Sequence, residues 1–276
     1  MTRDFHCGRF VLTVARPLIM GIVNLTDDSF SGDGLRGVAA AAVAQGRRLI
    51  DEGADILDFG AESSRPGAQP ISARQEIERL VPVLEALRDC GVPLSVDTVK
   101  PEVMRAALAA GADMINDINA LRAPRAIEVV AASQAAVCLM HMQGTPGSMQ
   151  ADPRYDDVVA EVAEFLAERV AAAEAAGIGL NRIVVDPGFG FGKTLEHNLE
   201  LLRRLDELMV SDLPLLAGLS RKSMLGQITG RAAPDRIHAG IAAHVLAVLR
   251  GARLVRVHDV AATRDALAVL SAVEEY

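Results

Sequence analysis

The stretch RRLIDEGADILDFG, residues 47–60, combines a helical pattern, a glycine and a short apolar run. A glycine that ends a helix readily adopts the left-handed conformation, which lets the chain turn directly into a strand. The stretch therefore predicts a helix that ends near Gly53 and a strand over residues 55–60. Repeated helix–glycine–strand units are typical of parallel sheets.

The same unit recurs along the chain. Glycines stand between helical patterns and apolar runs at four further positions, Gly91, Gly111, Gly177 and Gly251. The apolar runs that predict strands span residues 17–24, 55–60, 93–98, 113–118, 136–142, 182–188, 214–220 and 252–259. Eight such units in roughly 250 residues predict an α/β fold of the (β/α)8 TIM barrel type. A doubly wound open sheet is the alternative, because periodicity does not show whether a sheet closes.

The chain is expected to form one domain over residues 1–276, because no linker or low-complexity segment divides it. Residues 5–14, FHCGRFVLTV, precede the first unit and predict a short N-terminal hairpin at the bottom of the barrel.

Composition excludes several classes of protein. The net charge is −8, aromatic residues make up 3% and tryptophan is absent, which argues against a nucleic-acid partner. The three cysteines form no C-x-x-C pair. We therefore expect them to be reduced thiols rather than disulfides or zinc ligands. No apolar run reaches about 18 residues and the start lacks a signal-peptide pattern. We therefore expect a soluble, cytoplasmic protein with no membrane partner.

The glycine-rich stretch VVDPGFGFGKT, residues 184–194, raises the possibility of a phosphate-binding loop. A P-loop that ends at Lys193 and Thr194 requires glycine at position 187, where the chain has Pro187. Proline has no backbone N–H to offer a phosphate. The nucleotide interpretation therefore fails, and Lys193 is expected to be a solvated charge on the first turn of the next helix. The residue that matters here is predicted to be Asp186, which closes the apolar run.

Polar residues stand at the ends of all the predicted strands, where the active site of a TIM barrel lies. An acid at one strand end is more often a helix cap, but so many on one face predict a site. They are Asn24, Glu62, Ser63, Ser64, Arg65, Asp97, Asn116, Asp117, His141, Asp186, Ser220, Arg221, Lys222, Ser223, Arg256, His258 and Asp259.

The residue types suggest the ligand. Asp97, Asn116 and Asp186 suit a flat heterocycle with an amidine-like edge, because a buried carboxylate can accept two parallel N–H bonds. Positive charge in an acidic chain indicates an anionic part of the substrate, such as a pyrophosphate. The residues that carry it are Arg65, Lys222, Arg256 and His258. A zinc hydrolase would need clustered ligands, and no H-x-H occurs.

Arg256 and His258 are two residues apart on the last predicted strand, so their side chains are expected on the same side. The alternative assigns them structural roles, with His258 bonded to a neighbouring carbonyl and Arg256 paired with Asp259.

Over residues 20–260 the chain resembles the dihydropteroate synthase family. The motifs occur in the family's order: IMGIVNLTDDSFSGDG, DFGAESSRPGA, SVDT, INDI, CLMHMQGTPGSMQ, VVDPGFGFGKT, GLSRKSMLGQ and RVHDV. The resemblance implies condensation of 6-hydroxymethyl-7,8-dihydropterin pyrophosphate with p-aminobenzoate, by an SN1-like displacement that releases pyrophosphate. It also implies Mg²⁺ as cofactor, mobile loops after the first two strands, and a homodimer formed through the later helices.

The resemblance assigns roles residue by residue. Asn24 matches the family's Mg²⁺ ligand. Contacts to pterin fall on Asp97, Asn116, Asp186 and Lys222, and further substrate contacts on Ile118, Met140 and Gly218. Pyrophosphate and p-aminobenzoate contacts fall on Ser64, Arg65, Pro66, Phe191, Ser223, Arg256 and His258. The catalytic group is expected to comprise Arg65, Lys222, Arg256 and His258.

Three positions depart from the family pattern, with Asp27, Ala61 and Ser64 where proline, glycine and threonine are common. They affect the expected behaviour of the loops rather than the reaction. Two other functions remain open: a pterin-binding methyltransferase, which does not need SSRPG and RVHD to hold pyrophosphate, and a non-catalytic pterin-binding paralogue.

Overall fold

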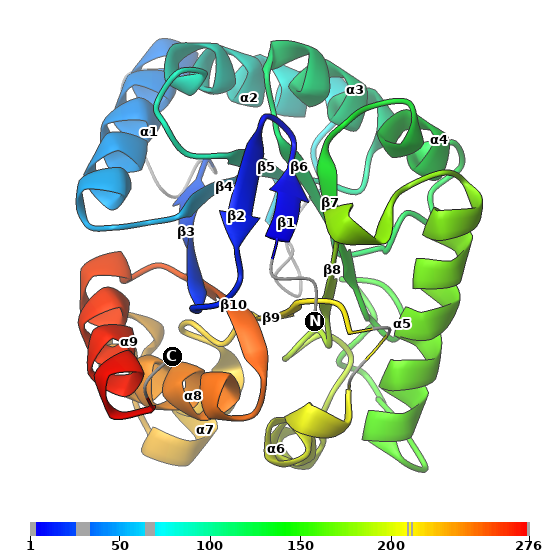
Figure 1. Ribbon diagram of the computed structural model, residues 1–276, viewed down its shortest axis with the longest axis vertical. Coiled ribbons are helices and arrows are strands. Elements are labelled where there is room, and N and C mark those ends of the chain that lie inside the picture. Colours follow the sequence, from blue (N-terminus) through cyan, green and yellow to red (C-terminus); the bar gives the residue numbers. More distant parts are fainter. Residues whose placement is uncertain (1–3, 26–33, 64–69, 209, 211, 275–276) are drawn as a thin grey trace.

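Eight parallel strands close into a barrel at the centre of the molecule (Figure 1). The computed structural model describes residues 4–25, 34–63, 70–208, 210 and 212–274. Around the barrel the strands are β10 (Ala252–Val257), β3 (Leu18–Asn24), β4 (Ile56–Gly60), β5 (Leu94–Asp97), β6 (Met114–Asp117), β7 (Ala136–Met140), β8 (Ile183–Asp186) and β9 (Leu215–Ala217). The predicted TIM barrel is confirmed, and the doubly wound sheet is wrong because β10 pairs with β3.

Helices pack around the outside of the barrel (Figure 1). The α-helices are α1 (Gly34–Asp51), α2 (Ala73–Leu87), α3 (Pro101–Ala110), α4 (Ala126–Ala131), α5 (Val158–Ala175), α6 (Leu195–Arg203), α7 (Ser223–Thr229), α8 (Ile237–Leu249) and α9 (Val260–Glu274). Short 3-10 helices are η2 (Leu180–Arg182), η3 (Leu205–Glu207) and η4 (Ala233–Asp235). Among the described helices, none has both the length and the apolar character needed to cross a membrane.

Glycine ends the helices as the sequence predicts. After α3, Gly111 has a φ of 105°, and its N–H donates to the carbonyls of Ala107 and Leu108. The other predicted positions also have positive φ, namely Gly53, Gly91, Gly177 and Gly251. Each predicted apolar run contains one barrel strand, and most runs continue beyond the end of that strand.

A hairpin of β1 (Asp4–Cys7) and β2 (Phe10–Thr13) crosses the barrel end where the strands begin (Figure 1). Phe5 and Cys7 are fully buried in the same cluster as the side chains that fill the barrel interior. The hairpin is also held by Arg9, whose Nε donates to Asp113 at 2.9 Å. Asp113 directly precedes β6, so the predicted plug at the bottom of the barrel is confirmed.

The register of the strands brings polar residues to one level at the opposite end, which we call the mouth. Asn24 of β3 pairs with Gly60 of β4, Gly60 with Asp97 of β5, and Asp97 with Asn116 of β6. Asp186 ends β8, beside Met140 at the end of β7. The absence of a side chain at Gly60 leaves room next to Asp97, whose Cβ would lie 3.7 Å from an added methyl group.

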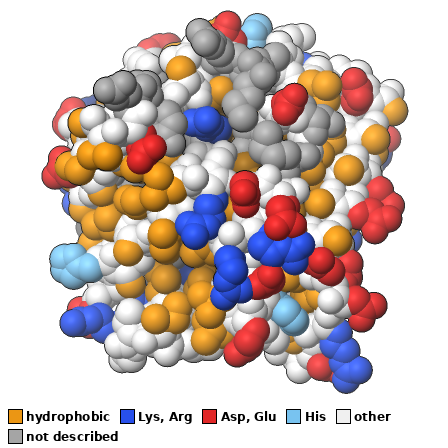
Figure 2. Space-filling model, turned by 60° about the horizontal axis from the view of Figure 1, so that its bottom comes forward, with side chains coloured by type: hydrophobic (Ala, Val, Ile, Leu, Met, Phe, Trp, Pro, Cys, Tyr) orange, Lys and Arg blue, Asp and Glu red, His pale blue; other side chains and the backbone are white. Residues whose placement is uncertain are grey.

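Hydrophobic side chains reach the surface on the last three helices. Large exposed ones are Ile228 on α7, Leu246 and Leu249 on α8, and Val269 and Val273 on α9. Figure 2 faces the side of the molecule that carries these last helices. Hydrophobic side chains gather on one part of this face, beside intermixed acidic and basic side chains (Figure 2).

Candidate active site

Arg256 of β10 lies between two carboxylates inside the mouth. Its Nε contacts Asp58 Oδ2 at 2.6 Å, and its second terminal nitrogen contacts Asp97 Oδ2 at 2.9 Å. The Arg256 side chain is 22% exposed and Asp58 is fully buried, so these ion pairs are poorly screened by solvent. Burial raises the pKa of Asp97 above its usual range, and the charge of Arg256 opposes that rise.

Asp58 is the residue of this cluster that sequence reasoning missed. It lies within β4, accepts from Ser95 Oγ at 2.6 Å, and accepts from Asn116 Nδ2 at 3.2 Å. It thereby orients the amide of Asn116, one of the predicted pterin contacts. The available signal was an acid inside the apolar run ILDFG, where a charged residue needs a buried partner.

Asp186 is held in one orientation at the end of β8. Its Oδ1 accepts the N–H of Gly188 at 2.7 Å, and only 6% of the residue is exposed. Its Oδ2 lies beside Gly218, where an added Cβ would be 3.9 Å away. Burial raises the pKa of Asp186 to about 6, whereas the Gly188 N–H and the charges of Lys222 and Lys193 act to lower it. Asp186, Gly218 and Arg256 therefore meet in one place, as predicted.

An apolar wall stands beside these polar groups. Ile118, Met140 and Phe191 form one buried cluster with Met142 and Met149. The ammonium of Lys222 lies 4.1 Å from the centre of the Phe191 ring. A cation over an aromatic face is attracted by its quadrupole, which fixes both side chains. The predicted contacts Ile118, Met140, Phe191 and Lys222 are thus brought together in the structure.

The structural alternative for Arg256 is wrong. Asp259 pairs with Arg221 at 2.8 Å, and Arg256 pairs with Asp58 and Asp97 instead. His258 Nδ1 lies 2.9 Å from Ser220 Oγ, which also accepts the His258 N–H. The Ser220 hydroxyl therefore sets the orientation of the imidazole. The predicted contact Ser223 is the first residue of α7 and is exposed.

The prediction for Lys193 is wrong. Lys193 precedes the helix, whose N-cap is Thr194, and only 3% of it is exposed. Its ammonium lies 2.8 Å from His141 Nδ1 and donates to the carbonyls of Gly188 and Phe191. The turns at the loop glycines bring the lysine back into the interior, and no single-residue pattern signals this. Burial lowers the pKa of Lys193 to about 7.

Two glycines of this loop, Gly188 and Gly192, lie against the backbone of a neighbouring segment. Gly188 has a φ of 69°, and an added Cβ would overlap the carbonyl oxygen of His141. Gly192 approaches the backbone of Gln143 in the same way. The close contacts are with the segment that follows β7, so the glycines let two loops of the mouth pack against each other.

Replacing Gly188 by alanine is therefore expected to lower the free energy of unfolding by about 3 kcal/mol or more, since a left-handed conformation and a backbone clash combine. Gly91→Ala is the matched control, because Gly91 has a φ of 90° but nothing within 4 Å of an added Cβ. We expect that control to cost only about 1–2 kcal/mol. Urea denaturation of both variants measures the difference, and equal losses would contradict the role of the close approach.

Some predicted residues cannot be placed. Ser64, Arg65 and Pro66 lie outside the described residues, as does Asp27. Asn24 ends β3 and is half-buried at the level of Asp97 and Asn116. It is therefore available as an oxygen ligand on the rim of the mouth.

The sequence has clear relatives. The pattern of the family described as "Pterin binding enzyme" matches residues 20–258. The chain is 50% identical over 276 residues to the dihydropteroate synthase of Neisseria meningitidis serogroup B, with 98% of this chain and 97% of that protein covered. The chain belongs to the dihydropteroate synthase family of pterin-binding enzymes. Members of the dihydropteroate synthase family are transferases.

Solved structures of dihydropteroate synthases have the same fold. The Xanthomonas albilineans enzyme with 4-aminobenzoic acid is 53% identical, with a TM-score of 0.93 and complete coverage of both chains. The Burkholderia cenocepacia enzyme complexed with 7,8-dihydropteroate is 50% identical, with a TM-score of 0.91 and coverage of 99% of this chain and 96% of that one.

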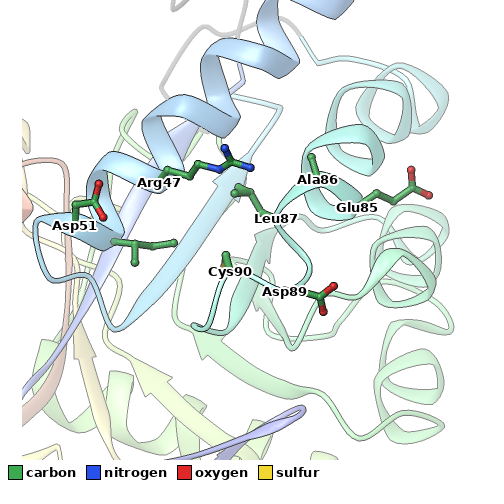
Figure 3. A pocket seen from close by; sticks show the side chains of 8 residues that line it. Arg47, Asp51, Glu85, Ala86, Leu87, Asp89 and Cys90 are labelled. Atoms are coloured by element: carbon green, nitrogen blue, oxygen red, sulfur yellow. The ribbon is translucent and has the colours of Figure 1, made fainter.

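A surface hollow of about 510 Å³ lies away from the mouth of the barrel (Figure 3). It is lined by Arg47, Ile50, Asp51, Glu85, Ala86, Leu87, Asp89 and Cys90. These residues end α1 and α2 or follow α2, so the hollow lies on the side where the strands begin. None of the predicted site residues lines it.

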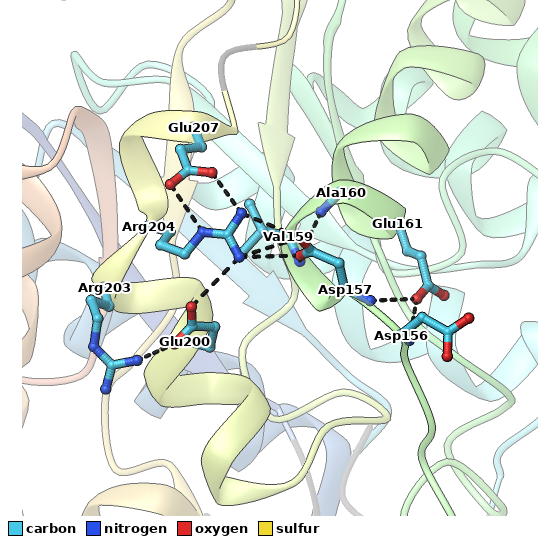
Figure 4. Close-up of polar contacts among 9 residues, drawn as sticks. All are labelled: Asp156, Asp157, Val159, Ala160, Glu161, Glu200, Arg203, Arg204 and Glu207. Carbon is cyan, nitrogen blue, oxygen red and sulfur yellow. Dashed lines mark hydrogen bonds and ion pairs between the residues drawn. The ribbon is translucent and has the colours of Figure 1, made fainter.

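A network of ion pairs links two outer helices of the dihydropteroate synthase barrel (Figure 4). Arg204, after α6, contacts Asp157, which caps the N-terminus of α5, as well as Glu200 and Glu207. The acidic partners are 36–52% exposed, so the network orients the helices but contributes little to stability.

Proposed function

We propose that this protein condenses 6-hydroxymethyl-7,8-dihydropterin pyrophosphate with p-aminobenzoate to form 7,8-dihydropteroate and pyrophosphate. The observation that carries the proposal is the group of buried polar side chains in the mouth, Asp97, Asn116 and Asp186. It stands in a chain that aligns with dihydropteroate synthases over almost its whole length.

The pterin ring is assigned to the space beside Asp186 Oδ2. The Gly188 N–H occupies Oδ1, so Oδ2 can accept N–H groups from the amidine-like edge of the ring. Asn116 supplies an amide whose orientation Asp58 fixes, and Lys222 supplies a further donor whose charge acts on Asp186. Gly218 leaves room for the flat ring against Asp186.

This assignment predicts a pH dependence for pterin binding. The ionised form of Asp186 accepts N–H bonds, and its pKa is about 6 in the protein without ligand. Affinity for 6-hydroxymethylpterin is therefore expected to fall as the pH is lowered through about 6, by about tenfold for each pH unit below it. Fluorescence titrations at a series of pH values measure this, and constant affinity across the series would contradict the role of an ionised Asp186.

The p-aminobenzoate ring is assigned to the apolar wall formed by Phe191, Ile118 and Met140, with Ser223 next to Lys222 at the start of α7. A benzoate ring needs apolar contact on its face and a polar group at its carboxylate. By family resemblance, Ser64, Arg65 and Pro66 complete this pocket, and they lie outside the described residues.

The bond that breaks joins the pterin methylene carbon to the pyrophosphate oxygen, and the electron pair leaves with pyrophosphate. The methylene carbon becomes a cation delocalised into the ring, so the displacement is SN1-like. Arg256 and His258 stabilise the negative charge that develops on the leaving group. The arylamine nitrogen then forms the new bond and loses a proton. It is nucleophilic at neutral pH, so no dedicated strong base is needed.

Mg²⁺ fits this arrangement through Asn24. The Asn24 amide oxygen is a hard ligand of the type that Mg²⁺ prefers, so Asn24 would hold the ion beside the pyrophosphate. When bound, Mg²⁺ would neutralise charge on the pyrophosphate.

The test is incubation of the protein with dihydropterin pyrophosphate, p-aminobenzoate and Mg²⁺, with product identified by mass spectrometry. We expect 7,8-dihydropteroate and pyrophosphate in equal amounts. Pterin binding without product would favour the non-catalytic paralogue. Methyl transfer from a methyl donor to an acceptor, both supplied in a parallel incubation, in place of condensation would favour the methyltransferase.

We also propose that the protein forms a homodimer through α7, α8 and α9. Support comes from the exposed hydrophobic side chains gathered there (Figure 2). Contiguous exposed apolar side chains often mark an interface. Sedimentation velocity of the protein and of a Leu249→Glu variant tests this, with dimer expected for the first and monomer for the second.

A cytoplasmic location is proposed as well. The cysteines Cys7, Cys90 and Cys138 are unpaired thiols, and two of them are buried inside the barrel. Reduced thiols of this kind are typical of cytosolic proteins.

A further inference from the structure

Lys193 is a buried lysine that the reaction described above does not use. Three acceptors surround its ammonium: His141 Nδ1 at 2.8 Å and the carbonyl oxygens of Gly188 and Phe191, each at 3.1 Å. An ammonium group has three N–H donors, so the site satisfies all of them when Nδ1 is the unprotonated nitrogen of the imidazole. No carboxylate among the described residues forms an ion pair with Lys193.

The two carbonyls belong to Gly188 and Phe191, and both residues contact side chains that are predicted to bind substrate. The Gly188 N–H donates to Asp186 Oδ1, and the Phe191 ring contacts the ammonium of Lys222. The Phe191 N–H in turn donates to the Gly188 carbonyl at 3.0 Å. Lys193 therefore holds the carbonyls at both ends of the Gly188–Phe191 loop. The same loop orients the carboxylate of Asp186 and the ring of Phe191.

His141 anchors this arrangement to the neighbouring strand end. Its N–H donates to the carbonyl of Asp186 at 2.9 Å, and its ring packs edge-on against Phe165 at 4.9 Å. Burial and the nearby charge of Lys193 lower the pKa of His141, which keeps the imidazole neutral and able to accept a hydrogen bond. The anchor is thus a rigid acceptor rather than a competing cation.

A buried ammonium costs free energy that a neutral donor would not. A neutral side chain also holds this loop, because Asn198 accepts the Gly190 N–H at 2.7 Å. The charge of Lys193 acts on Asp186, whose pKa it lowers together with Lys222 and Arg256. Cys138 also faces Asp186, and burial raises the pKa of its thiol, so it stays uncharged.

We propose that Lys193 is a positioning residue of the pterin site, which holds the Gly188–Phe191 loop in place and so keeps the Gly188 N–H on Asp186 Oδ1. The proposal rests on the proposed function for the identity of the ligand. It assigns Lys193 no contact with substrate.

The test measures binding of 6-hydroxymethylpterin to Lys193→Met as a function of pH. Methionine keeps the apolar stem and removes the charge and all three donors. We expect the dissociation constant at neutral pH to rise by about tenfold or more, and the pH midpoint of binding to move upward, because Asp186 loses the Gly188 N–H bond and a nearby cation, which both lower its pKa. A purely structural anchor would weaken binding without moving the midpoint.

Tyr155→Phe is the matched control. The Tyr155 hydroxyl donates to the Gly192 carbonyl at 2.7 Å, so its removal costs the same loop one hydrogen bond but no charge. We expect this variant to bind pterin within about threefold of the unmodified protein, with an unchanged midpoint. Unchanged pterin affinity in Lys193→Met, or weaker binding with an unchanged midpoint, would overturn the proposal.

Lys193→Gln serves if the methionine variant does not fold, because its amide can still donate to the two carbonyls. The upward movement of the midpoint is expected there too. If neither variant folds, carbon-13 NMR of the unmodified chain, which has three lysines, decides the matter. The Lys193 resonance must then shift on addition of pterin, whereas that of Lys100 stays unchanged. Failure of the unmodified protein to make dihydropteroate would count against the proposed function. The binding measurements test the positioning role of Lys193 separately.

Discussion

Asp186→Asn is expected to weaken binding of the pterin ring by about 3 kcal/mol or more, which is a factor of about 150 in affinity. The variant can keep the bond from the Gly188 N–H to its side-chain oxygen, because that bond fixes Oδ1. The amide NH2 then replaces Oδ2 beside Gly218 and faces the N–H groups of the ring. The loss of affinity has two causes. A charge-assisted hydrogen bond is missing, and the new amide donor faces the N–H donors of the ring.

The same substitution is expected to leave thermal stability unchanged or to raise it. The pKa of Asp186 in the folded protein is about 6, above the ordinary value near 3.8. Its ionised form is therefore less favourable in the folded state than in the unfolded state, and this cost is present at neutral pH. Asp152→Asn, on the surface, is the control. Calorimetric affinity within about threefold of the unmodified protein would show that Asp186 does not hold the ring.

Arg256→Ala is expected to reduce kcat by about 10²–10³, the usual effect of removing one preorganised charge at a developing anion. The variant also leaves Asp58 and Asp97 without their shared cation. Breaking such a buried pair costs about 3–5 kcal/mol of stability, so the activity must be measured below the melting temperature of the variant.

Arg221→Ala provides the matched control, because Arg221 pairs with Asp259 near the same strand end and is 34% exposed. We expect it to retain kcat within about tenfold. Affinities for pyrophosphate and for the bare hydroxymethyl pterin complete the test of Arg256. Since its guanidinium contacts Asp97 inside the ring pocket, both affinities should fall, and the pyrophosphate affinity should fall further. Equal losses would restrict Arg256 to the ring pocket and remove its role at the leaving group.

Most of the fold could be predicted because its determinants are local. Each helix–glycine–strand unit marks a strand within a few residues, and glycines such as Gly111 end helices wherever the chain must turn. Closure of the barrel was not visible in any single unit. It depends on the pairing of β10 with β3, between residues that are far apart in sequence.

The site was predictable to the extent that polar residues at strand ends must meet at one face. Asp97, Asn116 and Asp186 follow from that rule. Asp58 did not, because it lies inside a strand and is neutralised by Arg256 across the barrel. Lys193 was predicted to be solvated, since local sequence does not show that Gly188 and its neighbours fold the loop back over it. Both residues depend on contacts across the tertiary structure.

The most direct test of the account is the position of bound pterin in a crystal of the protein soaked with 6-hydroxymethylpterin. We expect electron density for the ring in the mouth, with its amidine-like edge within about 3 Å of Asp186 Oδ2 and a further contact to Asn116. Density elsewhere on the molecule, or a ring in the mouth whose edge faces away from Asp186, would contradict it.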